Sequence, residues 1–545
     1  MAKLKILDCT LRDGGYYNDW NFDKNFVKKM ISALNESGID IVEVGYKSKV
    51  KDKFYGLCRY CSDSQLEFLQ SYKKIEYSFM VDVKEFLNER QALDIPEIKR
   101  VIKPKKQNVF TWCRIATYYE TVSQAAEFVS ILKEMGYKVS FNIMGFSLLS
   151  QKQISSVMQK VKESLIDVIY ISDSFGSLVP EDISKMVNAL RQYYDRSIGI
   201  HTHDNQGLAF ANTIAAIKTG VDYIDASVSG MGRGAGNLRL EQLLLFLYFR
   251  YNRQDLNPYA LLDIIQEYLI SMHSNSQWGW DFSYMLSGLK NIHPTYCQKL
   301  KSSHQYTITQ VANILTAISN KHTVKYNPRE LIEASNKVLN PVCDDGKDRI
   351  MLKPYKVKQV DSIIILAGGS QLKQHNDALR TLAKKKKSLI LECNNTGVCV
   401  DLQRTIVVLN RVRLAELYDA GTFRSADEIV TGMRVVTPGL FVENLRYIGC
   451  SLGSGEFKVS KRLIVIPSYI VGMFAIGIAL LCNPKFIYLA GFEGFASGER
   501  EGEHKEMQDF WDMLQRSPYL EGKKMISVLP TRYNLPIQSI YSLID

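Results

Sequence analysis

The sequence lacks the features of a secreted, disulfide-bonded or zinc-ribbon protein. Its ten cysteines are irregularly spaced, and the Cys-x-x-Cys motif from Cys58 to Cys61 has no second pair at a zinc-ribbon distance. We therefore expect reduced thiols, as in cytosolic proteins. The N-terminal residues run straight into a strand-like segment, so we expect no signal peptide. Together these absences predict a cytoplasmic protein.

A long unbroken hydrophobic run and a strong excess of one charge are also missing. The longest apolar run, 463–482, is interrupted by Pro467, Ser468 and two glycines, which favours a buried strand and helix over a membrane span. The net charge is +11, from 68 basic and 57 acidic residues. The basic runs 103–106 and 384–387 contain no aromatic residues, so we expect no nucleic-acid partner. The charge suits an anionic substrate such as a phosphosugar, a nucleotide sugar or a carboxylate.

The first half of the chain has the pattern of a parallel α/β fold. At 545 residues the chain is too long for one core, which predicts at least two domains. Short apolar runs alternate with amphipathic helical patterns, and the expected strands are 4–11, 39–45, 77–81, 110–116, 138–144, 168–172, 197–202 and 223–228. Eight such repeats match a (β/α)₈ TIM barrel, assigned to residues 1–255. A doubly wound open sheet is the alternative, but it usually has fewer strands.

The remainder of the chain predicts three further segments. Residues 256–340 read as a helical subdomain near the barrel mouth, and residues 341–358 as a linker. Residues 359–545 predict a second α/β domain with a Rossmann-like sheet, whose expected strands include 388–392, 405–409, 428–430, 463–466 and 486–489. A glycine turn there can cradle a phosphate, and a ligand site is expected at Gly368, Gly369, Ser370 and Glu493.

Polar residues gather at the ends of the predicted barrel strands, where barrel enzymes carry their active sites. His201 and His203 are two residues apart on a strand, so both imidazoles face the same side. With Asp13 they form a mixed nitrogen and oxygen site suited to Mn²⁺, Mg²⁺, Co²⁺ or Zn²⁺. A pair of packed or surface histidines is the alternative, but the polar turn that follows this strand end favours a metal site.

A glycine-rich segment, Gly230-Met231-Gly232-Arg233-Gly234-Ala235-Gly236-Asn237, follows the last predicted strand. Its glycines let the backbone approach a ligand closely, and the helix that follows favours an anion. A flexible turn is the alternative. Phosphate and carboxylate sites recur at this place in barrel enzymes, which favours the ligand site.

Three ordered motifs, Thr10–Gly14, His201–Asn205 and Gly232–Asn237, resemble those of the DRE-TIM metallolyase superfamily over roughly residues 1–300. That superfamily includes HMG-CoA lyase, isopropylmalate synthase and 4-hydroxy-2-oxovalerate aldolase. The resemblance implies that Asp13, His201, His203 and Asn237 bind the metal, and that Arg12 steadies an enolate oxygen. A bound divalent ion would act as a Lewis acid on a 2-keto acid, and Arg12 would add a fixed cation where negative charge develops.

The sequence departs from hydroxy-oxovalerate aldolases at the expected base. Those enzymes carry a histidine three residues after the metal-binding aspartate, and here that position is Tyr16. We expect the catalytic base to be Tyr16 or His293 from the helical subdomain. The Arg-Asp-Gly-Gly-Tyr start resembles aldolase-like proteins of bacterial surface-polysaccharide pathways, and no acyl-CoA signature supports a Claisen-type synthase.

The sequence therefore predicts a divalent-metal-dependent aldolase that makes or breaks a C–C bond through a 2-keto acid enolate. Pyruvate and a sugar-type aldehyde are the expected reactants, in surface-glycan metabolism, with Mn²⁺ or Mg²⁺ preferred and a homo-oligomer expected. Asp8, Glu43 and Asp173 either orient ligands or complete a polar layer of the barrel. The second domain is alternatively a glycosyl- or nucleotidyl-transferase, or a docking module. The substrate-binding residues expected at the mouth are Glu43, Arg114, Asn142, Asp173, Gly234 and Gly236.

Overall fold

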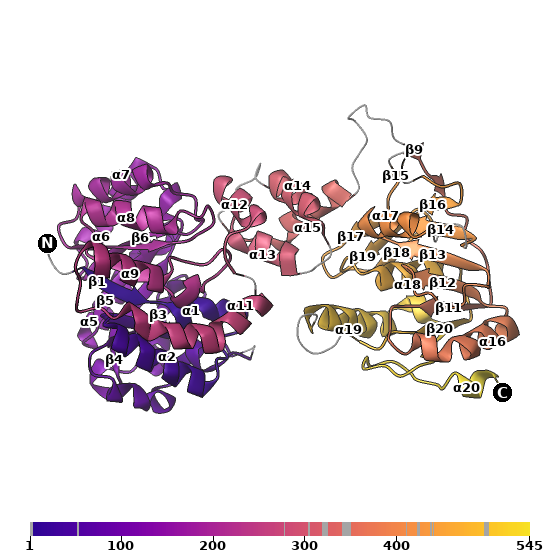
Figure 1. Cartoon of the computed structure of the whole chain (residues 1–545), viewed down its shortest axis with the longest axis horizontal. Helices are drawn as coiled ribbons and strands as arrows, with labels where there is room; N and C mark the ends of the chain where they lie inside the picture. Colours follow the sequence, from indigo (N-terminus) through magenta and orange to yellow (C-terminus); the bar gives the residue numbers. More distant parts are fainter. Residues whose placement is uncertain are drawn as a thin grey trace. The chain divides into compact units, whose positions relative to one another are not determined.

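The computed structural model (Figure 1) divides the chain into two compact units. The first comprises residues 1–298 and 322–325, and the second comprises residues 299–321 and 326–545. The structure describes residues 4–51, 54–276, 278–302, 306–318, 325–339, 350–409, 411–421, 426–436, 439, 441–494 and 501–544.

The first unit is a closed barrel of parallel strands in sequential order. The barrel closes because β1 pairs with both β2 and β8, so that Leu7 lies beside Ile41 on one side and Asp225 on the other. The predicted TIM barrel is confirmed. Its strands are β1 (Lys5–Asp8), β2 (Ile41–Tyr46), β3 (Glu76–Asp82), β4 (Phe110–Thr117), β5 (Lys138–Ile143), β6 (Val168–Asp173), β7 (Ser197–Thr202) and β8 (Tyr223–Ala226).

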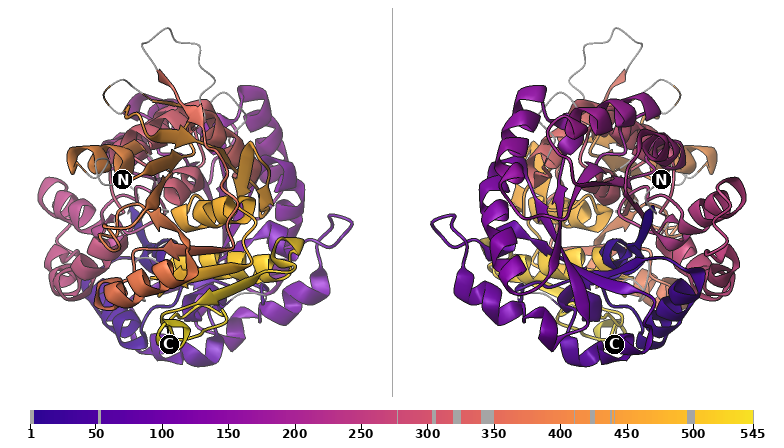
Figure 2. Two further views of the ribbon diagram at one scale, coloured as in Figure 1. Left: turned by 90° about the vertical axis from the view of Figure 1, so that its right-hand side faces the viewer. Right: turned by 90° about the vertical axis from the view of Figure 1, so that its left-hand side faces the viewer.

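Helices surround these strands, as the right-hand view of Figure 2 shows. The first long helix, α2 (Lys24–Ser37), begins where the Asp23 side chain accepts the N–H groups of Asn25 and Phe26, and ends at Gly38 with a φ of 80°. Its apolar stripe faces the barrel. The other helices before residue 303 are α1 (Thr10–Gly14), α3 (Leu57–Tyr60), α4 (Ile95–Val101), α5 (Val122–Glu134), α6 (Gln151–Lys162), α7 (Pro180–Arg191), α8 (Ala209–Thr219), α9 (Leu240–Arg250), α10 (Leu262–Ile264), α11 (Ile270–Ser276), α12 (Phe282–Leu289) and α13 (Pro294–Ser302).

The side chains inside the barrel change from apolar to charged along the strands. A small apolar cluster includes Ile41 of β2 and Trp112 of β4. Two residues further along the same strands, and therefore on the same face, stand Glu43 and Arg114, both buried. The charged layer thus lies toward the carboxyl ends of the strands.

The second unit is built on a parallel sheet in the order β10-β16-β14-β13-β12-β11-β20-β21. The separate parallel α/β sheet is as predicted. Its strands are β10 (Lys353–Pro354), β11 (Ser362–Leu366), β12 (Leu389–Cys393), β13 (Arg404–Val408), β14 (Glu428–Thr431), β16 (Leu445–Tyr447), β20 (Phe486–Ala490) and β21 (Lys524–Ser527). The sequence analysis missed β10, β16 and β21, which have two, three and four residues.

Smaller elements complete the second unit. One expected strand, β19 (Leu463–Ile466), lies outside the main sheet, between β17 (Gly449–Leu452) and β18 (Lys458–Val459). A two-stranded sheet pairs β9 (Ile350–Met351) with β15 (Val435–Val436). The helices are α14 (Ile308–Ile318), α15 (Pro328–Leu339), α16 (Asn376–Lys386), α17 (Arg411–Asp419), α18 (Val471–Leu481), α19 (Glu501–Gln515) and α20 (Tyr541–Ile544).

The longest apolar run of the sequence forms β19 and the buried helix α18. Within the part of the chain that the structure describes, no helix has the length and apolar character needed to cross a bilayer. Helix α12 belongs to the first compact unit, whereas α14 and α15 belong to the second. The finer boundaries at residues 255, 340 and 358 stay a prediction, and half of the expected linker, 341–349, lies outside the described residues.

Candidate metal centre

Three buried side chains converge at the carboxyl end of the barrel. Asp13 lies on α1, shortly after β1. His201 is the penultimate residue of β7, and His203 directly follows that strand. The Nε2 atoms of His201 and His203 are 3.8 and 3.9 Å from the Asp13 Oδ2 atom. One ligand atom from each residue lies within 4.8 Å of the others, which makes this group able to hold a metal ion. Three of the four predicted protein ligands are therefore brought together.

The second ring nitrogen of each histidine is already engaged. The Nδ1 atom of His201 lies 3.0 Å from an Asp225 carboxylate oxygen, and the Nδ1 atom of His203 lies 2.8 Å from the Asp173 carbonyl oxygen. Both acceptors favour a proton on Nδ1, which leaves each Nε2 lone pair directed at the site. This arrangement holds both imidazoles in the tautomer that a metal needs.

Asn237 lies against the same carboxylate. Its Nδ2 atom donates to Asp13 Oδ2 at 2.7 Å, and its buried Oδ1 atom has no hydrogen-bond partner among the described residues. A Cβ atom at Gly232 would lie 2.4 Å from Asn237 Nδ2, so glycine is needed there for the amide to fit. The donor set of one carboxylate, two imidazoles and one amide oxygen fits a divalent ion.

Arg12 links the site to the charged layer of the barrel. Its guanidinium contacts Asp13 Oδ1 at 2.5 Å and Glu43 Oε2 at 2.6 Å. Its Nη2 atom is buried, without a hydrogen-bond partner among the residues described. A buried donor without an acceptor is costly, and a substrate oxygen beside the metal position would satisfy it.

Glu43, Arg114 and Asp225 form a buried ion network behind the site. Arg114 donates to both Asp225 oxygens, at 2.5 and 2.9 Å, and its Nε atom lies 3.2 Å from Glu43 Oε1. Glu43 and Arg114, expected to bind substrate, thus hold Arg12 and Asp225 in place, and substrate binding by them stays a prediction. The sequence analysis missed Asp225. A lone aspartate among apolar strand residues at an inward position was the available signal.

The charges around the site keep its ligands ready for a metal. Burial alone would raise the pKa of Asp13, but the nearby Arg12, His201 and His203 together bring it below its usual range. Burial, helped by the charge of His201, lowers the pKa of His203 to about 3. Deprotonated carboxylate and neutral imidazole are the forms that bind metal, so Asp13 and His203 need lose no proton near neutral pH.

The two candidate bases both lie near Arg233 of the glycine-rich loop. The Tyr16 hydroxyl lies 3.1 Å from that of Tyr46, and the Tyr16 side chain is 39% exposed. His293 is half-buried at the start of α13, and its Nδ1 atom accepts the N–H of Thr295 at 3.4 Å. Burial, together with the charge of Arg233, lowers the pKa of His293 to about 3. A neutral imidazole is the form that can accept a proton.

The other expected substrate-binding residues lie around the same barrel end. Asn142 accepts a hydrogen bond from the Ser172 hydroxyl, and Asp173 accepts the N–H of Ser177 at 2.9 Å. Gly236 has a φ of 80°, and a Cβ atom there would lie 2.2 Å from the Gly230 carbonyl oxygen. These contacts support the loops around the metal position, and their role in substrate binding stays a prediction.

The predicted site residues of the second unit also come together. Glu493 accepts the Ser370 hydroxyl at 2.8 Å and the Gln371 N–H at 2.7 Å, so this carboxylate is bound to the glycine turn, and a ligand at the turn stays a prediction. Gly368, Gly369, Ser370 and Glu493 line a cavity of about 980 Å³ at the carboxyl ends of β11, β12 and β20.

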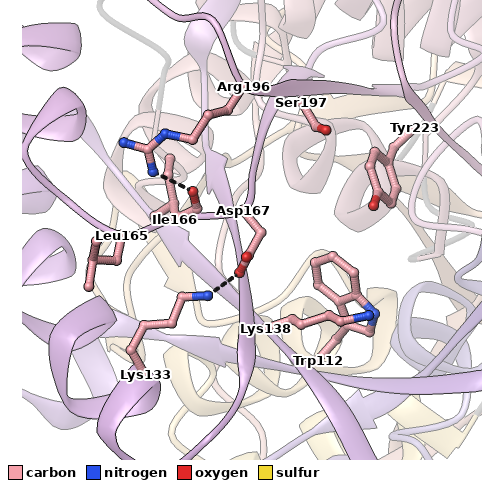
Figure 3. A pocket seen from close by; sticks show the side chains of 9 residues that line it. All are labelled: Trp112, Lys133, Lys138, Leu165, Ile166, Asp167, Arg196, Ser197 and Tyr223. Atoms are coloured by element: carbon pink, nitrogen blue, oxygen red, sulfur yellow. Dashed lines mark hydrogen bonds and ion pairs between the residues drawn. The ribbon is translucent and has the colours of Figure 1, made fainter. Parts of the chain in front are cut away.

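A second cavity, of about 650 Å³, lies at the amino ends of β4 to β8 (Figure 3). Its cations are already paired: Lys133 contacts Asp167 at 2.5 Å, and Arg196 donates to the Ile166 carbonyl at 2.8 Å. This is the end of a barrel associated with stability, so the cavity offers no candidate site.

Comparisons with known proteins identify relatives of the barrel. The model of the HMGL-like family matches residues 98–267. A 4-hydroxy-2-oxovalerate aldolase from Bacillus cereus is 30% identical over 269 residues, which are 48% of this chain and 75% of that protein. The oxaloacetate decarboxylase of Mycobacterium tuberculosis is 23% identical over 335 residues, or 60% of this chain and 94% of that protein.

A solved structure extends the agreement to the fold. The N-terminal domain of a candidate aldolase from Bacteroides vulgatus superposes with a TM-score of 0.51 and 32% sequence identity. The match covers 56% of this chain and 98% of that domain. A further relative, the 4-hydroxy-2-oxovalerate aldolase of Geobacillus genomosp. 3, is 25% identical over 59% of this chain and 93% of its own length.

Proposed function

Because this chain belongs to the HMGL-like family, within the DRE-TIM metallolyase superfamily of carbon–carbon lyases, we propose that its barrel is a divalent-metal-dependent aldolase acting through a 2-keto acid enolate. The observation that carries the proposal is the buried group of Asp13, His201 and His203, with Asn237 beside it. Pyruvate is the simplest 2-keto acid of the right chemistry. Mn²⁺ or Mg²⁺ is the proposed metal.

When bound, the metal supplies Lewis-acid polarisation of the keto oxygen. Arg12 supports the same step, because its buried Nη2 donor is free to receive the oxygen on which negative charge develops. Its other nitrogens are held by Asp13 and Glu43, so the guanidinium is oriented before substrate arrives. Either Tyr16 or His293 moves the proton at the mouth of the site.

We propose that the aldehyde is of sugar type and that the reaction serves bacterial surface-glycan metabolism. The support for this is the motif around Arg12 and Tyr16, which resembles that of aldolase-like proteins of polysaccharide pathways. A sugar aldehyde also suits the polar mouth of the barrel.

For the second unit we propose binding of a nucleotide or nucleotide sugar. In its sheet the chain runs outward from β11 through β12 and β13, and then β20 pairs on the other side of β11. Parallel sheets bind ligands in the crevice outside the strand ends where the order reverses, which is where the 980 Å³ cavity lies. A docking module is the alternative. A thermal-shift screen of the full chain with nucleotides and sugar nucleotides separates the two. If no compound changes the melting temperature, the docking module is favoured.

The test of the barrel proposal is deuterium exchange into the methyl group of pyruvate, followed by NMR. We expect exchange that stops when a chelator removes the metal and returns when Mn²⁺ or Mg²⁺ is added. The double variant His201→Ala/His203→Ala should bind no metal and catalyse no exchange. Exchange and metal content that both survive in the double variant would overturn the proposal. Arg250→Gln on the exposed end of α9 controls for the preparation.

A further inference from the structure

The glycine-rich loop after β8 places one arginine, Arg233, beside the metal position. A Cβ atom at Gly232, on one side of it, would lie 2.4 Å from the Asn237 amide. On the other side, Gly234 has a φ of 69°, and a Cβ atom there would lie 3.3 Å from the Cβ atom of Pro294. The loop is therefore fixed between the metal-facing Asn237 and the start of α13, and Arg233 projects from its centre.

A second contact pins this loop. The Tyr17 hydroxyl donates to the Gly234 carbonyl oxygen at 2.8 Å. Because Tyr17 follows α1, which carries Asp13, the loop is tied to the segment that supplies the metal-binding carboxylate. The position of Arg233 relative to the site is thus set by the backbone.

Arg233 differs from the other two arginines of the site in its partners. Arg12 and Arg114 are buried and paired with carboxylates. Arg233 is half-buried, its guanidinium lies 5.4 Å from the Tyr16 ring centroid, and within the described residues it has no carboxylate partner. Its charge also reaches both His203 and His293, since it adds to the effect of burial in lowering the pKa of each.

We propose that Arg233 binds a second anionic group, a carboxylate or a phosphate, on the aldehyde substrate. The inference rests on the proposed function, in which the metal and Arg12 take the carboxylate and keto oxygen of the 2-keto acid. That leaves Arg233, near Tyr16 and His293, as a cation without a carboxylate partner among the described residues. A planar guanidinium suits two-point recognition of either group, and removing a half-buried cation from water without a partner is costly.

The experiment compares Arg233→Gln and Arg233→Lys with the matched surface variant Arg250→Gln, which removes the same charge at the exposed end of α9. Three aldehydes serve as probes: neutral D-glyceraldehyde, D-glyceraldehyde 3-phosphate and succinic semialdehyde. Each is assayed as an acceptor for pyruvate and as an inhibitor of pyruvate deuterium exchange, a readout that needs no condensation. Comparing the phosphorylated probe with the carboxylated probe shows whether Arg233 prefers a phosphate or a carboxylate.

In the wild type we expect at least one anionic aldehyde to bind better than glyceraldehyde. Arg233→Gln should weaken the binding of that anionic aldehyde by about 10- to 100-fold, which is the range of a charge-assisted hydrogen bond. The binding of glyceraldehyde should change by less than about threefold. Arg233→Lys should retain part of the preference, because it keeps the charge and loses the planar fork. This lysine variant decides the matter if the glutamine variant does not fold.

Equal losses for neutral and anionic aldehydes, or an Arg233→Gln variant that behaves like Arg250→Gln, would overturn the inference. A wild type that prefers glyceraldehyde would do the same. These outcomes differ from failure of the proposed function, which appears as absence of metal-dependent pyruvate exchange in the wild type.

Discussion

Asp225→Asn tests whether the buried ion network holds the metal ligands. The substitution keeps the shape of the side chain but removes its charge, and Asp225 is the residue that contacts both Arg114 and the Nδ1 atom of His201. Arg114 is fully buried, and its remaining carboxylate contact is the 3.2 Å approach of Nε to Glu43. The variant therefore leaves a buried cation poorly compensated.

The magnitude follows from this geometry. Removing one partner of a buried ion pair lowers the free energy of unfolding by about 3–5 kcal/mol. Because the asparagine amide of the variant still accepts one hydrogen bond, we expect a loss near the lower end of that range. The metal should bind about 10- to 100-fold more weakly, because His201 loses the negatively charged acceptor that orients its ring and raises its basicity. The matched control is Glu97→Gln, which removes an exposed pair with Arg100 on α4 and should cost at most about 1 kcal/mol.

Two measurements on the same samples decide this prediction. Urea unfolding of the metal-free protein is followed by tryptophan fluorescence, because four of the five tryptophans lie in the first unit. Mn²⁺ affinity is measured by calorimetry. If Asp225→Asn unfolds within about 1 kcal/mol of Glu97→Gln and binds Mn²⁺ as tightly as the wild type, the network does not support the metal site.

Two further predictions concern other parts of the chain. Burial raises the pKa of Asp8 to about 7 although hydrogen bonds from Thr10 oppose the rise, so its stabilising contribution is complete below pH 4 and is lost as the pH rises through 7. The free energy of unfolding of the metal-free wild type should therefore fall by a few kcal/mol relative to Asp8→Asn between pH 4 and 8, and parallel pH profiles would contradict this. In the second unit, Gly369→Ala should lower the melting temperature and any nucleotide-induced shift, since its Cβ atom would lie 2.5 Å from Glu493 Oε1 and 2.6 Å from Gly491 Cα. Gly368→Ala, whose Cβ atom meets nothing within 4 Å, is the matched control, and equal melting curves for the two variants would refute the reasoning.

The barrel could be predicted because its strands are buried on both faces and stand out as short apolar runs. The predicted bounds of β7 agree with the structure, and those of the other barrel strands differ by a few residues at their ends. Asp13, His201 and His203 could be grouped because the fold places all carboxyl ends of parallel strands together. The superfamily predicted from the motifs is confirmed by the comparisons.

What the sequence could not provide was contact across the barrel interior. Asp225 pairs with Arg114, which is 111 residues away, and neither residue carries a local signal of that pairing. The glycines after β11 illustrate a second limit. They predict a phosphate cradle, and that stays a prediction, because Gly369 also allows a close approach of Gly491 and Glu493 accepts the N–H of Gln371. A glycine needed for backbone packing and one needed for a ligand have the same sequence pattern.

The pairing of β1 with β8 has a consequence for when this chain could bind the proposed metal. Asp13 and Asn237 meet although they are 224 residues apart, so no shorter stretch of the nascent chain contains the complete donor set. Contacts of such long range form late, because the entropy of closing the intervening loop must be overcome first. Tight metal capture should accordingly coincide with closure of the barrel, and the ion would bind folded chains in preference to those still being synthesised.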